Sequence, residues 1–347
     1  MQPYESVFTQ GNSLDNENPT CYTLVILRRM KDALACHPTR YGRTNYFLDL
    51  DYGGDSLKII NSVCTSLVFP QSRKSLRDFR RMAEFLGGKG IDCIEFYHDG
   101  DGRDRIGPIL ADAGLDAIYI AVIPSKEGKL HLCDCNEGGR QSAVRLFQNC
   151  IDEAQANGIG RVMMNSGAMQ TDTRKGLDAL GRSVEELFGY AARKNYRGFA
   201  LTLEPCDTGM EAFQLIGPYA RAKAFAQAMR EKGLPLELTM DSAHTAEEGE
   251  DFFQAVEATR EFCGHLHFAN CNITQPDNPL YGDKHLGYEY PHTVWTPETL
   301  GQLTRQLQAL YPGEEPLRIG LEFLCREDDP YSYFERTWDS LPFLHKA

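Results

Sequence analysis

Eight repeats of a strand-like segment followed by a helix-like segment constrain the fold of this chain more than any other feature of its sequence. The strand-like segments are short β-branched or aromatic runs at residues 57–68, 91–97, 117–123, 160–165, 198–204, 236–240, 265–270 and 318–323. The helix-like segments, with apolar residues at helical spacing, follow at residues 75–86, 103–113, 139–156, 175–194, 211–232, 247–263, 297–310 and 331–341. Strands that alternate with helices pair in parallel through right-handed crossovers, and eight such units fit a closed (β/α)₈ barrel. We therefore predict an α/β protein with a TIM barrel at residues 56–347, with an open doubly wound sheet as the alternative.

The first 55 residues do not follow this alternation. They contain one apolar run, at residues 22–27, and the aromatic-rich segment NYFLDLDYGGD. Such aromatics favour packing over a free tail. We expect residues 1–55 to form an N-terminal extension that covers the barrel or a subunit interface, so that the 347 residues make one barrel with an extension rather than two domains.

The charge balance excludes several classes of partner. Lys and Arg total 36 against 49 Asp and Glu, a formal charge of −13, which argues against binding to nucleic acid or to anionic membranes. The polar start has no signal-peptide pattern, and the longest apolar runs are too short to span a membrane, so we expect a cytoplasmic protein. The eleven cysteines include no C-x-x-C pair, which favours reduced, mostly buried thiols over a zinc site built on His131, Cys133 and Cys135.

Polar residues with metal-ligand chemistry terminate four consecutive predicted strands. Active sites of barrels lie at the carboxyl ends of the strands. The residues at these ends are Glu204 in TLEP, Asp241 and His244 in TMDSAH, His265 and His267 in HLHFAN, and Glu322 in GLEF. Three carboxylates and an imidazole on adjacent strands would converge on one point, and this set of oxygen and nitrogen ligands suits Mn²⁺, Mg²⁺ or Co²⁺.

These four segments, in this order, resemble the strand-end motifs of the xylose-isomerase-like superfamily of barrels. That superfamily includes sugar isomerases, ketose 3-epimerases, inosose dehydratases and apurinic-site endonucleases. The resemblance implies one divalent metal, Mn²⁺ first and Mg²⁺ or Co²⁺ as alternatives, held by Glu204, Asp241, His267 and Glu322. It also implies that His244 contacts the substrate.

This ligand set suits proton transfer next to a sugar carbonyl. A cation bound to adjacent carbonyl and hydroxyl oxygens polarises the carbonyl and stabilises an enediolate. Glu204 and Glu322 come from strands on different sides of the site, so we expect them to act as acid and base. His244 would bind a substrate hydroxyl or shuttle its proton, because imidazole titrates near neutral pH. We therefore expect a metal-dependent isomerase or epimerase acting on a small carbohydrate.

Further substrate contacts are expected from other parts of the rim. Strand two ends in Glu95 and His98, and strand four ends at Asn165. The long loop after strand seven contains Asp283 and His285, in a D-x-H pattern that resembles one serving a further metal in the endonucleases. We favour loop ordering or substrate contact for this pair over a second metal.

His265 lies two residues before His267, so the two face the same side of their strand. We expect His265 to lie deeper in the barrel, where it either supports the metal ligands or belongs to the core.

Two other functions remain open. The segment FANCNITQ after the strand-seven histidine lacks the arginine usual in ketose 3-epimerases. The longer segment HFANCNITQPDNPLYGDKH resembles proteins described broadly as sugar phosphate isomerases/epimerases, and it also resembles the catalytic α subunits of C-glycoside deglycosidases. Those lyases act on 3-oxo-C-glycosides together with a small β subunit, whereas an isomerase should act alone or as a homo-oligomer. The third possibility is a non-catalytic sugar-binding barrel. Signatures of P-loops, dinucleotide sites and serine hydrolases are absent from the sequence.

Overall fold

The computed structural model describes residues 58–311 and 316–345, so the expected N-terminal extension at residues 1–55 lies outside the described residues. Eight parallel strands form a closed barrel in which each strand pairs with the next and β8 pairs with β1. The strands are β1 (Ile59–Cys64), β2 (Cys93–Phe96), β3 (Asp116–Ile120), β4 (Arg161–Asn165), β5 (Ala200–Glu204), β6 (Glu237–Asp241), β7 (Cys263–Ala269) and β8 (Leu317–Glu322). The closed order confirms the predicted TIM barrel and excludes the open sheet.

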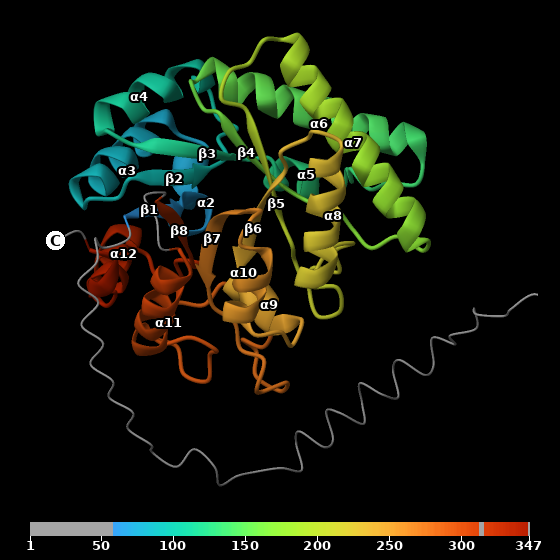
Figure 1. Cartoon of the computed structure of the whole chain (residues 1–347). Helices are drawn as coiled ribbons and strands as arrows, with labels where there is room; N and C mark the ends of the chain where they lie inside the picture. The colour runs from blue at the N-terminus through green and yellow to red at the C-terminus, as the bar shows by residue number, and fades with distance from the viewer. Residues whose placement is uncertain (1–57, 312–315, 346–347) are drawn as a thin grey trace, which may run out of the picture. The chain divides into compact units, whose positions relative to one another are not determined.

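Helices surround the strands (Figure 1). The α-helices are α2 (Thr65–Val68), α3 (Leu76–Gly88), α4 (Ile106–Ala113), α5 (Val122–Gly128), α6 (Glu137–Ala156), α7 (Thr173–Arg193), α8 (Tyr219–Glu231), α9 (Ser242–Glu247), α10 (Phe252–Thr259), α11 (Pro297–Leu310) and α12 (Pro330–Asp339). Short 3₁₀ turns occupy Pro70–Arg73, Arg103–Arg105 and Pro342–Leu344. Polar side chains begin several of the helices: Ser75, Asp172 and Thr296 accept hydrogen bonds from backbone N–H groups in the first turns of α3, α7 and α11.

Some predicted boundaries were wrong. The run 57–68 was expected to be one strand, but β1 ends at Cys64 and α2 follows at once; likewise β3 ends at Ile120, before α5. In both cases apolar residues continue past the strand into a short, partly buried helix at the rim, and periodicity cannot separate the two over so few residues. The predicted helix 211–232 starts only at Tyr219, because residues 205–218 form a loop held by Asp207. The predicted helix 247–263 shrinks to α10, preceded by the unexpected α9.

The strands of the second half of the barrel alternate strictly between two environments. In β5, Leu201 and Leu203 join the core between sheet and helices, whereas Thr202 and Glu204 do not. The same period of two continues through β6, β7 and β8, and it sends carboxylates, imidazoles and hydroxyls into the barrel interior. Thr202 and Thr239, for example, are buried there and share a hydrogen bond of 2.7 Å.

The interior differs between the two halves of the barrel. A second apolar cluster is contributed by β1 to β4 and the start of α5, and its buried members are Cys64, Cys93, Ile118, Ile120, Val122 and Met163. The polar groups of β5 to β8 lie against this cluster. One half of the interior is therefore mainly apolar and the other half is polar, with Ser62, Glu95 and Asn165 as buried polar exceptions in the first half.

Candidate metal centre and active site

Four ligand side chains meet at the carboxyl ends of the strands. Glu204, Asp241 and Glu322 are the last residues of β5, β6 and β8, and His267 lies two residues before the end of β7. The structure brings these four sequence-predicted ligands together, with one ligand atom of each within 4.8 Å of the others. His267 Nδ1 lies 2.7 Å from Glu204 Oε1, 2.6 Å from Glu322 Oε2 and 3.7 Å from Asp241 Oδ2.

Two carboxylate oxygens of this cluster have no hydrogen-bond donor among the described residues. Asp241 Oδ1 caps α9 by accepting the N–H groups of Ala243 and His244, both at 2.8 Å, while the buried Oδ2 has no partner. Glu322 Oε2 is also buried and makes no hydrogen bond of acceptable geometry, despite its short distance to His267. Buried carboxylate oxygens are costly unless a donor or a cation faces them. Three carboxylates with one imidazole therefore fit a divalent cation such as Mn²⁺ or Mg²⁺.

The titration behaviour of the cluster reflects its crowding of negative charge. Burial raises the pKa of Asp241 to about 7, against the opposing effect of His244, and the neighbouring carboxylates of Glu322 and Glu204 add to the rise. Burial alone would also raise the pKa of Glu322, but His267 beside it lowers that pKa to about 2. Burial would lower the pKa of His267, and the surrounding carboxylates instead raise it well above its ordinary value. The carboxylates of this cluster therefore strongly favour a positive charge between them.

A small cavity of about 110 Å³ adjoins the cluster, and its two walls differ. Its polar wall is lined by Glu204, His244, His267, His285 and Glu322, and its other wall by Cys64, Ser66, Leu67, Ile120, Val122, Ile123, Lys126 and Met163. The second wall is almost entirely apolar because it continues the apolar half of the barrel interior.

Lys126 was not among the residues expected in the site, although it follows strand three closely. It lies on α5 and is the one Lys or Arg in the cavity lining. Burial would lower the pKa of its ammonium group, but surrounding anionic groups such as Glu204 and Asp283 raise it. Lys126, which is also exposed to solvent, therefore brings a positive charge to the cavity lining.

Two residues expected to reach the substrate from strand two are occupied elsewhere. Glu95 is fully buried on the far side of His267, and its oxygens accept hydrogen bonds from Ser62, His265 and His267. The His98 ring lies between the carbonyls of Ser72, at 2.9 Å, and Asp101, at 3.4 Å, and does not line the cavity. In the structure Glu95 therefore hydrogen-bonds His267 from behind, and His98 hydrogen-bonds carbonyls of the neighbouring loops, so neither side chain lines the cavity.

The remaining expected contacts lie close to the centre. Asn165 ends β4 in register with Glu204, and its buried Nδ2 has no hydrogen-bond partner. His244 Nδ1 lies 3.2 Å from Glu247 Oε2 and 3.9 Å from Asp283 Oδ2.

His285 lies between Asp283 and the candidate metal ligand Glu322. Its Nδ1 lies 3.2 Å from Asp283 Oδ1 and 3.8 Å from Glu322 Oε1. His244, Asp283 and His285 therefore form a connected polar series beside the cavity.

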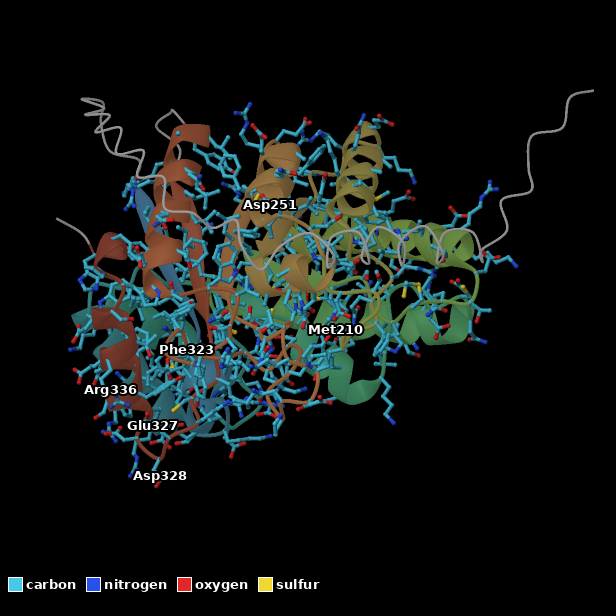
Figure 2. The ribbon with its side chains drawn as sticks, turned by 90° about the horizontal axis from the view of Figure 1, so that it is seen from below. Met210, Asp251, Phe323, Glu327, Asp328 and Arg336 are labelled. Carbon is cyan, nitrogen blue, oxygen red and sulfur yellow. The ribbon has the colours of Figure 1, made fainter. Side chains whose placement is uncertain are left out.

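The loop after β5 depends on one carboxylate that sequence reasoning missed. Asp207 is fully buried and accepts backbone N–H groups of residues 209–212 at 2.6–3.2 Å. Met210, labelled in Figure 2, lies on this loop. Glu211 of the same loop forms an ion pair with Lys284, which is next to Asp283 in the loop after β7. By ordering the loop after β5, Asp207 therefore indirectly connects it to the loop after β7.

Replacing Asp207 by alanine is expected to reduce the free energy of unfolding by about 3 kcal/mol at pH 7, because several hydrogen bonds to a charged acceptor are lost. Burial opposes ionisation of Asp207, but the backbone N–H groups lower its pKa below the ordinary value. Stabilisation by this group is therefore complete above its unfolded pKa of about 4 and disappears as the pH falls through the lower folded value. Urea titrations at pH 7 and pH 3 check this, and an equal difference between wild type and variant at both pH values would contradict it.

The burial of the thiols agrees with the sequence prediction. The nine cysteines within the described residues are all free, and six of them are buried. No metal-binding group among the described residues includes His131, Cys133 or Cys135.

A match to a known protein family covers the part of the chain that contains most of the candidate ligands. A sequence model described as "Xylose isomerase-like TIM barrel" matches residues 81–290, more than half of the chain. The chain belongs to the xylose isomerase-like TIM barrel family. The span that matches the family includes Glu204, Asp241 and His267, and ends before Glu322.

Solved structures of similar fold agree with membership of the xylose isomerase-like TIM barrel family. A D-tagatose 3-epimerase-like protein shares 16% identity, with 82% of this chain and 97% of that chain covered and a TM-score of 0.61. 3-Keto-D-glucoside 4-epimerase from E. coli shares 18% identity, with 82% of this chain and 98% of that chain covered and a TM-score of 0.57. D-psicose 3-epimerase from Clostridium cellulolyticum H10 shares 15% identity, with 79% of this chain and 89% of that chain covered and a TM-score of 0.54. At these identities the likeness establishes the fold alone.

No curated protein matches the chain in sequence. Among the described residues, none of the helices has the length and apolar character needed to cross a bilayer.

Proposed function

We propose that the protein is a divalent-metal-dependent isomerase or epimerase that acts on the carbonyl of a carbohydrate through an enediolate. The observation that carries the proposal is the cluster of Glu204, Asp241, His267 and Glu322 at the rim, with two buried carboxylate oxygens that lack a donor. Membership of the family and the fold shared with solved sugar epimerases support the substrate class. Mn²⁺ is the first candidate, with Mg²⁺ and Co²⁺ as alternatives.

A cation bound by these four residues would polarise a sugar carbonyl and stabilise negative charge on its oxygen. Glu204 and Glu322 would exchange the proton of the adjacent carbon, one as base and the other as acid. They extend from β5 and β8, with β6 and β7 between them. The neighbouring His267 keeps the pKa of Glu322 low, so at neutral pH its carboxylate is in the ionised form that can accept a proton.

The polar series beside the cavity would bind the substrate hydroxyls. His244 and His285 line the cavity directly, and Asp283 contacts both of their rings. Asn165 would contribute its unpartnered amide nitrogen. In this arrangement His244 either donates to a hydroxyl oxygen or passes its proton on, as expected for an imidazole.

Metal analysis followed by assays on a substrate panel tests the proposal. The purified protein is expected to contain or bind about one equivalent of Mn²⁺ per chain and to interconvert at least one ketose or 3-oxo-glycoside of the panel. Inososes complete the panel, because they also carry a carbonyl beside a hydroxyl. A protein that binds no divalent cation, or whose turnover is unaffected by a chelator, would rule the mechanism out.

One observation favours a second candidate, a lyase acting on 3-oxo-C-glycosides. The apolar cavity wall of residues such as Ile120, Ile123 and Met163 offers few partners to sugar hydroxyls and would suit an apolar aglycone. Release of free aglycone during the assay would identify the lyase, and epimerised sugar without aglycone release would identify the isomerase. The lyase is also expected to require a small β subunit, whereas the isomerase is expected to act alone or as a homo-oligomer. A protein that retains sugar affinity but converts nothing would be a binding barrel.

A further inference from the structure

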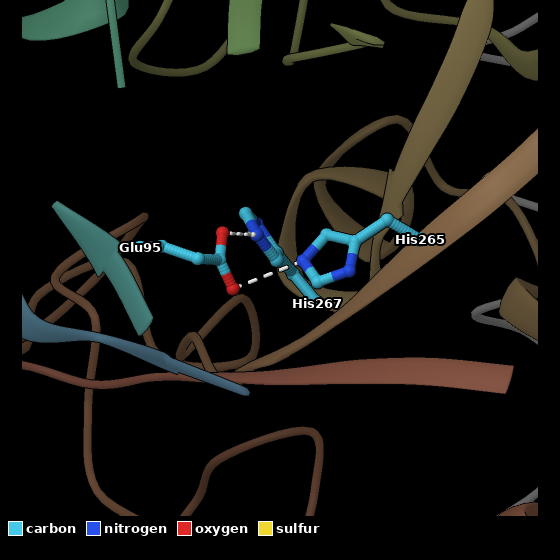
Figure 3. Close-up of side chains that lie close together, drawn as sticks. All are labelled: Glu95, His265 and His267. Atoms are coloured by element: carbon cyan, nitrogen blue, oxygen red, sulfur yellow. Dashed lines mark hydrogen bonds and ion pairs between the residues drawn. The ribbon is translucent and has the colours of Figure 1, made fainter. Parts of the chain in front are cut away.

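A fully buried carboxylate lies on the side of His267 that faces away from the three candidate carboxylate ligands. Glu95, on β2, accepts hydrogen bonds at Oε1 from Ser62 Oγ at 2.8 Å and from His265 Nε2 at 2.9 Å. Its Oε2 accepts from His267 Nε2 at 2.7 Å. Figure 3 shows the carboxylate joined to both imidazole rings. Neither oxygen is left for a substrate.

The barrel interior has a space shaped for this carboxylate. Ser62 of β1, Gly320 of β8 and His267 of β7 are register partners in one row across three strands. The first two are small, so the side chain of Glu95 can cross from β2 to β7 above them. A Cβ atom at residue 320 would lie 2.3 Å from Glu95 Oε1 and 3.0 Å from His265 Nε2, which is too close. A glycine is therefore required at this position for the network to exist.

The network determines which nitrogen of His267 carries hydrogen. Because Glu95 can only accept, His267 Nε2 must be the donor, which leaves Nδ1 as the nitrogen that can present a lone pair to a cation at the rim. Nδ1 lies within 2.7 Å of oxygens of both Glu204 and Glu322, and a single N–H could satisfy only one of them. A lone pair and three carboxylates directed at one point form a cation site.

We propose that Glu95 is the positioning residue of the metal centre: through its hydrogen bond it fixes the tautomer and orientation of His267, and Ser62 and His265 hold Glu95 in place. The inference rests on the proposed function, since it presupposes that His267 is a metal ligand. Carboxylates behind ligating imidazoles raise ligand basicity, and their loss generally weakens metal affinity 10- to 100-fold. Glu95 thus acts on the metal without touching it.

Calorimetric titration of Mn²⁺ into the full-length protein tests this role. In Glu95→Gln the dissociation constant for Mn²⁺ is expected to rise about 10- to 100-fold relative to wild type. The matched control is Thr239→Val, which removes a different buried hydrogen bond of the barrel interior, and its dissociation constant is expected to stay within about twofold of wild type. Urea unfolding of the metal-free proteins separates a loss of stability, which both variants can show, from a loss of metal affinity.

The outcomes distinguish this inference from the proposed function. If wild type binds Mn²⁺ and Glu95→Gln binds it equally well, the positioning role is overturned while the metal centre stands. If wild type binds two equivalents and the variant one, Glu95 is itself a ligand and the positioning role is again overturned. If wild type binds none, the proposed function fails as well.

Two further measurements test the positioning role of Glu95 if the Glu95→Gln variant does not fold. Ser62→Ala removes only one support of Glu95 and is expected to weaken Mn²⁺ binding several-fold. Nitrogen NMR of the wild-type protein loaded with diamagnetic Mg²⁺ is expected to show hydrogen on Nε2 of His267. Hydrogen on Nδ1 of this residue would overturn the inference.

Discussion

Replacing Glu204 by glutamine is expected to reduce kcat by about 10²–10⁴-fold, the range that a positioned general acid or base contributes. The amide keeps the shape of the side chain at the end of β5 but cannot take up a proton from the substrate carbon. The measurement is kcat and KM on the best substrate of the panel at saturating Mn²⁺. Because the loss belongs to the proton transfer, kcat and kcat/KM should fall together, with little change in KM.

Two controls make this result interpretable. Glu257→Gln makes the same chemical change on the exposed surface of α10 and should retain wild-type kcat. The dissociation constant of the Glu204→Gln variant for Mn²⁺ must be measured as well, because Glu204 is also a candidate ligand, and the assay must saturate the metal. A variant that is saturated with metal and turns over at more than about a tenth of the wild-type rate would exclude Glu204 as acid or base.

Removal of the metal is expected to abolish turnover and to destabilise the barrel. At 100 times its dissociation constant, Mn²⁺ should add about 2.7 kcal/mol to the free energy of unfolding by mass action, which raises Tm by several degrees in a chain of this size. Chelation should reverse this gain. The physical reason is the cluster itself, in which the buried Asp241 and Glu322 oxygens lack donors until a cation faces them.

Turnover assays and thermal unfolding, each with and without EDTA and again after return of excess Mn²⁺, measure both effects in one preparation. In Asp241→Asn the gain in Tm from Mn²⁺ should largely disappear, since a charged ligand is replaced by a neutral one whose cap to α9 can persist. The Glu257→Gln control should keep the full gain. An identical gain in Tm for wild type and Asp241→Asn would remove Asp241 from the ligand set.

The sequence predicted most of the second half of the barrel because local patterns and tertiary environment agree there. In β5, the alternation of Leu201 and Leu203 with Thr202 and Glu204 is visible in the sequence and is the same alternation that the folded barrel uses. A carboxylate that directly ends such a strand must lie at the rim. The convergence of the four candidate ligands followed from strand order alone.

The positions that sequence reasoning missed depend on contacts between distant residues. The role of Glu95 comes from its fit beside Ser62 and Gly320 and its contact with His267, 172 positions away, none of which a local pattern reveals. His98 follows an apolar strand as a rim residue would, yet a returning loop places the carbonyl of Ser72 against its ring. The short helices α2 and α5 were not predicted because the apolar residues that begin them continue the composition of the preceding strand.

The division of the barrel interior into a polar and an apolar half has a consequence for how such an enzyme could change its specificity. In the proposed mechanism the acid, the base and the ligands of the cation all come from β5 to β8, whereas Leu67, Ile123 and Met163 on the opposite wall of the cavity would take no part in either step. Substitutions on that wall would alter which molecules fit without disturbing the chemical apparatus. Such a scaffold would separate selectivity from reactivity, because one wall of the cavity could diverge or be engineered while the other is held constant.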